Sequence, residues 1–178
     1  GLAQGQGVIY VGSFSKTLFP ALRLGYLVLP QQWMPKAAAL LQALYGDVAL
    51  VPQAVTADFI LEGHFGRHLR KMRQLYQHKQ QYCLNLIREF LPDAILHARY
   101  AGLHLCIEFP YRIADQQLTA ELVKRGYRIQ PLSRYVFSGI KRTGLVIGLA
   151  HTTEQQLMVA VKLIALLVPC YKDAGTME

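Results

Sequence analysis

The stretch VIYVGSFSKTLFPALRLGYLVLP, residues 8–30, decides the fold. Its first residues, VIYVG (8–12), are β-branched or aromatic and predict a short buried strand. Its last residues, RLGYLVLP (23–30), predict a second strand. The polar loop between them contains Pro20, which excludes a regular helix there. The stretch is therefore expected to form two strands joined by a loop that carries a lysine.

The loop brings together groups that suit a ligand with both an aldehyde and a phosphate. We expect Lys16, at the end of a buried strand, to be partly desolvated, which favours its neutral amine. A neutral amine can attack a carbonyl to form a Schiff base. The hydroxyls of Ser13 and Ser15 and the guanidinium fork of Arg23 are typical phosphate-binding groups. Pyridoxal 5'-phosphate (PLP) carries both functional groups.

The whole segment resembles the lysine loop of fold-type I PLP enzymes, the aspartate-aminotransferase superfamily. Within that superfamily it is most similar to the aminotransferase-like domain of MocR-type regulators of the GntR family. The resemblance runs from about Val8 to about Leu167. A bare Ser-x-Ser-Lys is a weak signal, but four later stretches match as well: EGHFGRHLRKMRQLY (62–76), AGLHLCIEF (101–109), PLSRY (131–135) and GLVIGLAHTTEQQL (144–157).

The resemblance implies a role for each polar residue of the loop. Lys16 would form the aldimine with PLP, and Ser13, Ser15 and Arg23 would hold its phosphate. The alternatives are a solvated loop lysine, an arginine in a surface ion pair, and serine hydroxyls that cap backbone amides.

The resemblance also implies a substrate-binding arginine near the end of the chain, and here the sequence departs from the family pattern. That arginine is expected in the strand containing LVIGLA, where the sequence is apolar around Val146. This departure puts ordinary amino-acid transamination in doubt. Arg134, in PLSRY, could contact a substrate carboxylate from a nearby loop, or it could be an ordinary surface arginine.

Two features of the family lie upstream of the lysine. One is the aspartate that pairs with the pyridine nitrogen, and no acid occurs between Gly1 and Ser13. The other is the N-terminal winged helix-turn-helix of a MocR-type regulator. Since the chain starts at Gly1 rather than Met, we expect a truncation or proteolytic product that is inactive alone.

The predicted fold class is α/β: the C-terminal part of a fold-type I aminotransferase large domain plus its small α+β domain. The large-domain part with a connector helix is expected over 1–92 and the small domain over 93–178. Helices are predicted at 31–44, 52–63, 66–90, 115–126 and 153–168, and further strands at 94–98, 103–109, 127–130 and 145–150. On the connector helix, one face carries Leu69, Met72, Tyr76, Cys83, Ile87 and Phe90.

Composition limits the class of protein. The 178 residues are 52% hydrophobic and 17% charged, which excludes wholesale disorder. Three cysteines without a CxxC pair argue against a disulfide framework and favour a reducing compartment. The N-terminus has no signal-peptide pattern, and the apolar stretch 157–170 is short and contains Lys162. We therefore expect a cytoplasmic protein without a membrane partner.

Two other clusters of polar side chains are interpreted as having no ligand-binding role. His64 and His68 have a zinc-compatible spacing, but no third ligand joins them, so no metal is predicted. A basic stretch of the same helix is interpreted as a solvated face rather than a DNA-binding surface: Arg67, Arg70, Lys71, Arg73, His78 and Lys79.

Two functions remain open. The first is the effector-sensing domain of a MocR-type regulator, in which PLP on Lys16 reacts with an amino acid or amine. The alternative is a free-standing aminotransferase of 2-amino acids. In both cases the parent protein is expected to be a homodimer, and DNA would be bound only through an N-terminal domain that this chain does not contain.

Overall fold

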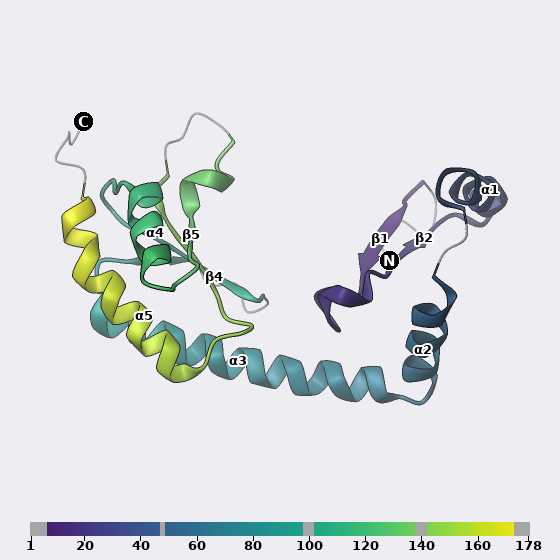
Figure 1. The fold of residues 1–178 in the computed structure, drawn as a ribbon, viewed down its shortest axis with the longest axis horizontal. Coiled ribbons are helices and arrows are strands. Elements are labelled where there is room, and N and C mark those ends of the chain that lie inside the picture. Colours follow the sequence, from purple (N-terminus) through teal and green to yellow (C-terminus); the bar gives the residue numbers. More distant parts are fainter. Residues whose placement is uncertain (1–6, 47–48, 98–101, 138–141, 173–178) are drawn as a thin grey trace. The chain divides into compact units, whose positions relative to one another are not determined.

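The computed structural model describes residues 7–46, 49–97, 102–137 and 142–172 (Figure 1). The chain forms two compact units, Gly1–Lys71 and Met72–Glu178.

The first unit begins with two antiparallel strands. β1 (Tyr10–Ser13) pairs with β2 (Gly25–Val28), and their register places Ser13 opposite Gly25. The remaining elements are helical: two 3-10 turns at Pro20–Leu22 and Gln31–Trp33, α1 (Met34–Tyr45), α2 (Leu50–Leu61) and the start of α3 (His64–Phe90). Both predicted strands and both predicted helices of this unit are thus confirmed.

The prediction that the first strand is buried is wrong. Val11 in β1 is 70% exposed and Val28 in β2 is 56% exposed. Among the described residues, β1 and β2 pair only with each other, and all four residues of β2 are exposed. Of the side chains described in this unit, Thr56 alone is buried.

The second unit is built on a four-stranded sheet in the order β3-β4-β6-β5, with every neighbouring pair antiparallel. The register pairs His104 with Gly148 at one end of the central strands and Glu108 with Gly144 at the other. The elements are β3 (Ile95–His97), β4 (His104–Glu108), α4 (Asp115–Lys124), β5 (Gln130–Pro131), a 3-10 turn (Leu132–Tyr135), β6 (Gly144–Gly148), α5 (Glu154–Leu167) and a 3-10 turn (Val168–Tyr171).

The core of the second unit joins the sheet to the helices. Leu105, Ile107 and Leu145 are fully buried in the central strands, and Leu118 and Ile164 are fully buried on α4 and α5. This accounts for the alternation of buried and half-buried residues along β4. The expected α/β class is confirmed by this mixture of helix and sheet.

Helix α3 contributes to both units. Its predicted apolar face is its less exposed face, and Cys83 and Ile87 on that face are fully buried in the second core. Burial raises the pKa of the Cys83 thiol to about 12, so this cysteine is protonated at neutral pH. Because the C-terminal half of α3 packs in that core, the compact units divide at residue 71, whereas the sequence-based boundary follows the end of the helix at 92.

The ends of α4 and α5 follow the local sequence signals. Gly126, with φ of +88°, ends α4, and the amide of Tyr127 donates to the carbonyl oxygen of Leu122. Thr153 caps α5, where its hydroxyl accepts from the Gln156 amide and the Gln156 side chain accepts from the Thr153 amide.

One segment of the described chain, Glu154–Tyr171, is long and apolar enough to span a membrane by length and composition alone. In the structure, the face of α5 that carries Leu157, Val161 and Ile164 packs into the core of the second unit. On α5, Lys162 places its ammonium over the ring of Phe90.

Candidate functional site

The lysine loop leaves β1 and returns to β2 in a closed turn. The Phe14 amide donates to the Leu24 carbonyl oxygen at 3.0 Å, which extends the ladder by one step beyond Ser13. The Leu18 amide donates to the Phe14 carbonyl oxygen at 2.8 Å and closes a turn around Lys16. Residues 15, 16 and 23 therefore lie beyond the same end of the two-stranded ladder.

The serines of the loop differ in their contacts. Ser13 Oγ accepts a hydrogen bond from the Ser15 amide at 3.2 Å, which is the backbone-capping role expected as the alternative. This bond uses only the acceptor side of the hydroxyl, so its O–H can still donate. Ser15 is half-buried, and its hydroxyl makes no hydrogen bond with any part of the chain that the structure describes.

Lys16 and Arg23 are both exposed, and the side chain of neither makes a hydrogen bond or ion pair with a described residue. The expected desolvation of Lys16 is therefore wrong for this structure, because the strand that precedes it is itself exposed. Arg23 has a φ of +51°, the one positive φ among the described non-glycine residues. Such strain is disfavoured for a residue with a Cβ, and it often marks a functional position.

The start of α3 supports the lysine loop. His68 Nε2 donates to the Thr17 carbonyl oxygen at 3.0 Å, and the Phe65 ring meets the Phe14 ring edge to face at a centroid distance of 5.9 Å. The sequence analysis assigned no such role to His68. The matching stretch at 62–76 was the available signal, but it did not show which loop the helix would contact.

Arg134 lies in the second unit, in the 3-10 turn that follows β5. It is exposed, and its Nη1 donates to Gln130 Oε1 at 3.2 Å. Val146, where the family arginine was expected, is half-buried in β6 and pairs with Cys106 and Gln130. The role of Arg134 stays a prediction.

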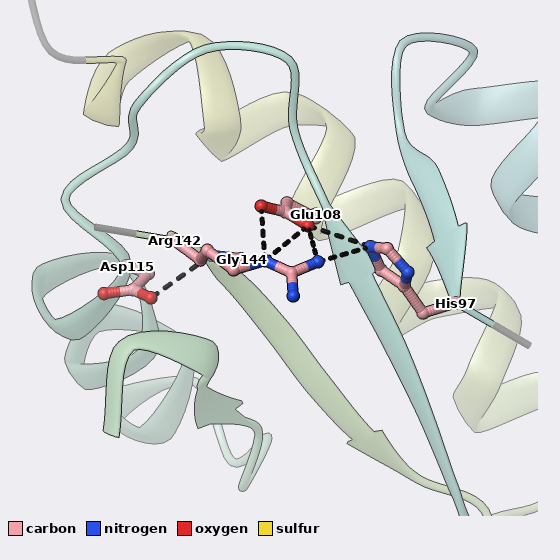
Figure 2. Close-up of polar contacts among 5 residues, drawn as sticks. All are labelled: His97, Glu108, Asp115, Arg142 and Gly144. Carbon is pink, nitrogen blue, oxygen red and sulfur yellow. Dashed lines mark hydrogen bonds and ion pairs between the residues drawn. The ribbon is translucent and has the colours of Figure 1, made fainter. Parts of the chain in front are cut away.

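The segment that carries Arg134 is held by a buried carboxylate that the sequence analysis did not single out. Asp115, at the start of α4, is 3% exposed. Its Oδ2 accepts from the Ser133 amide at 2.9 Å and from the Gly144 amide at 3.2 Å, and its Oδ1 accepts from the Ser133 hydroxyl at 2.7 Å. Figure 2 shows the bond to Gly144. One carboxylate thus joins α4, the 3-10 turn and the start of β6.

A second polar cluster lies at the same end of the sheet (Figure 2). Arg142 binds Glu108 with two nitrogens, from Nε to Oε1 at 3.0 Å and from Nη2 to Oε2 at 2.6 Å. His97 Nε2 lies 2.8 Å from Oε2 of the same carboxylate. The hydrogen bond from Arg142, together with the bond from His97, holds the pKa of Glu108 below its usual range, although burial opposes the shift.

This lowered pKa predicts how stability depends on pH. Glu108 binds its proton less readily in the folded chain than in the unfolded chain. Its contribution to the free energy of unfolding is therefore complete above the unfolded glutamate pKa of about 4.3. We expect that contribution to be lost as the pH falls through the lower folded pKa. The groups facing Glu108 are Arg142, His97 and Cys106.

Urea unfolding between pH 7 and pH 3 checks this expectation. Below about pH 4.3, the free energy of unfolding of the Glu108→Gln variant should fall less steeply with decreasing pH than that of the wild type. Glu89→Gln, which changes an exposed acid on α3 in the same unit, should show the same dependence of the free energy of unfolding on pH as the wild type. Identical profiles for wild type and Glu108→Gln would contradict the assignment.

The groups of the lysine loop fit the cofactor that the sequence predicts. The amine of Lys16, the hydroxyl of Ser15 and the guanidinium of Arg23 belong to residues beyond one end of the ladder, next to Ser13 at the end of β1, and the polar ends of Lys16, Ser15 and Arg23 have no described partner. This donor set matches an aldehyde with an attached phosphate. Among the described residues, no group of three or more metal-ligating side chains is present.

Comparison with known proteins identifies similar sequences. The model of the family described as aminotransferase class I and II matches residues 1–164. A protein of Rhizobium meliloti named "Probable rhizopine catabolism regulatory protein MocR" is 36% identical over 151 residues, which are 84% of this chain and 31% of that protein. The Escherichia coli K12 protein "Uncharacterized HTH-type transcriptional regulator YjiR" is 32% identical over 158 residues, 88% of this chain and 33% of that protein. The chain thus spans about a third of the length of these curated relatives.

Solved structures show the same fold. An archaeal alanine:glyoxylate aminotransferase superposes with a TM-score of 0.83 at 18% identity, over 94% of this chain and 42% of that chain. The kynurenine aminotransferase of Pyrococcus horikoshii gives a TM-score of 0.81 at 21% identity, over 93% of this chain and 41% of that chain. The predicted fold, part of an aminotransferase, is therefore confirmed.

Proposed function

Because the chain belongs to the class I and II aminotransferase family, we propose that it is the aminotransferase-like, effector-binding part of a MocR-type transcriptional regulator of the GntR family. The observation that carries this proposal is the match of most of the chain to regulators at 36% and 32% identity. The solved aminotransferases share the fold at 18–21% identity.

In this proposal the lysine loop binds PLP. Lys16 would hold the cofactor covalently, and Ser13, Ser15 and Arg23 would bind its phosphate. When bound, PLP supplies an electron sink that stabilises negative charge at the α-carbon of an attached amine. The amine of Lys16 would be the base that moves a proton at that carbon.

The effector is an amino acid or another amine, with Arg134 as the contact for a carboxylate. The anchor from Asp115 to Ser133 would restrict the movement of the backbone next to Arg134. We further propose a cytoplasmic homodimer that binds DNA through a separate N-terminal domain. Apolar side chains are exposed on β1, β2, α1 and α2. They support contacts with a second subunit or with another part of the protein, because exposed apolar surface of this kind often marks an interface.

The second candidate is a free-standing aminotransferase of 2-amino acids, which the shared fold supports. The apolar residue at Val146 speaks against it, because a substrate carboxylate then lacks its usual partner. Reading the gene upstream of the codon for Gly1 separates the two: a winged helix-turn-helix supports the regulator, and its absence supports the enzyme.

Covalent trapping tests the cofactor site. The chain is incubated with PLP, reduced with borohydride and digested, and the labelled peptide is identified by mass spectrometry. We expect the pyridoxyl label on Lys16 and its complete loss in Lys16→Ala. Lys36→Ala, which removes another exposed lysine of the same unit, is the matched control and should keep the label. An unchanged label in Lys16→Ala would remove Lys16 from this role.

A further inference from the structure

A hollow of about 540 Å³ opens in the second unit, away from the polar clusters around Asp115 and Glu108. It lies at the end of the central strands where His104 pairs with Gly148, whereas Glu108 pairs with Gly144 at the other end. None of the residues predicted to bind PLP or substrate lines it. Its volume falls in the range typical of small-molecule sites.

The floor of the hollow is apolar and fixed. Ile129, Ile147, Leu157 and Ala160 line it, and all four are buried in the structure. They belong to strand β6, helix α5 and the segment that leads into β5. An apolar ligand in the hollow would make van der Waals contacts with these side chains.

The rim of the hollow is basic. Arg128, His104 and His151 line it, and no aspartate or glutamate does. All three side chains are exposed, and none makes a hydrogen bond or ion pair with a residue that the structure describes. A guanidinium without a partner beside an apolar floor suits a carboxylate on an apolar body.

The walls are held in place before any ligand arrives. Lys79 on α3 donates from Nζ to the carbonyl oxygens of Leu149 and Ala150, at 3.4 and 3.3 Å. The Thr152 hydroxyl donates to the Leu149 carbonyl oxygen at 3.2 Å. Opposite, the Gly126 turn fixes the segment that carries Arg128. Such preorganisation reduces the entropy lost on binding.

We propose that this hollow is a binding site for a small organic carboxylate with an apolar body, separate from the lysine loop. Arg128 binds the carboxylate, His104 and His151 complete the basic rim, and the apolar body lies on Ile129, Ile147 and Leu157. The proposal does not depend on PLP binding at Lys16, because the two sites share no residue.

The test is a titration of the full 178-residue chain with benzoate, followed by amide chemical shifts in NMR. Benzoate should give saturable shifts at Gly126–Ile129 and Gly148–Thr152. Benzamide, which has the same shape without the charge, and inorganic phosphate, which has charge without the ring, should each bind about fivefold more weakly or worse.

Variants separate the site from general anion binding. Arg128→Gln should weaken benzoate binding about fivefold or more. Arg112→Gln, which changes an exposed arginine outside the hollow, should change the affinity for benzoate by less than about twofold. The amide spectrum of each variant shows whether it is folded, and His104→Gln gives a second rim variant. Equal binding by Arg128→Gln, equal binding of benzamide or of phosphate, or shifts without saturation across exposed residues would each overturn the proposal.

Discussion

Replacing Gly144 with alanine is expected to lower the free energy of unfolding of the second unit by about 3 kcal/mol. Gly144 begins β6 opposite Glu108, and a Cβ added there would meet the carbonyl oxygen of Ile107 and the Cα of Glu108. Both are backbone atoms of β4, so they cannot move aside as a flexible side chain would. The two central strands would have to separate, and the bond from the Gly144 amide to Asp115 would lengthen.

Gly148, at the other end of the same strand, is the matched control. An added Cβ there would meet only His104 Cδ2, at an ordinary 3.9 Å. Gly148→Ala is therefore expected to leave stability unchanged or to raise it by about 0.5 kcal/mol, because alanine restricts the unfolded chain. Urea unfolding followed by far-UV circular dichroism measures both, since the single tryptophan, Trp33, lies in the first unit. Equal midpoints for the two variants would contradict the packing at Gly144.

Removing the carboxylate of Asp115 is expected to lower the free energy of unfolding by an amount similar to that for Gly144→Ala. Asp115→Ala would leave the amides of Ser133 and Gly144 and the Ser133 hydroxyl without their acceptor, in a site where Asp115 is 3% exposed. Unpaired buried groups cost about 1–3 kcal/mol each, and water that enters the space recovers part of this. We expect a loss of about 3 kcal/mol in the free energy of unfolding.

Asp115→Asn tests whether the loss comes from the hydrogen bonds. Its amide oxygen can still accept from both backbone amides, and its NH₂ can donate to the Ser133 hydroxyl, so we expect a loss of about 1 kcal/mol. Asp93→Ala, which removes an exposed acid of the same unit, should change stability by less than about 0.5 kcal/mol. The same urea unfolding measures all three, and an alanine variant as stable as wild type would contradict the anchor.

The secondary structure was largely predictable because its signals are local. The capping residues of α5 and the glycine that ends α4 each depend on a few neighbouring residues. The apolar spacing on α3 is equally local, and the face that it predicts is confirmed. Burial was predictable only where a second layer exists. VIYVG has the composition of a buried strand, but burial depends on what packs against it, and β1 is exposed among the described residues.

The polar contacts of the site were less predictable, because they join residues far apart in sequence. Arg142 reaches Glu108 across 34 positions, and His68 reaches Thr17 across 51. Asp115 is an ordinary first-turn acid in the sequence, and only the folded chain brings Ser133 and Gly144 to it. The loop residues Ser13, Ser15, Lys16 and Arg23 were found because their pattern is contiguous, and their roles remain predictions.

The scarcity of buried side chains in the first unit has a consequence for its energetics. Of the described side chains in the first unit, only Thr56 is buried, so this part of the given chain gains little from the hydrophobic effect and is expected to be less stable than the second unit. A ligand bound by both Lys16 and Arg23 would stabilise the folded form of the hairpin by mass action. Occupancy of the lysine loop and rigidity of the hairpin would then increase together.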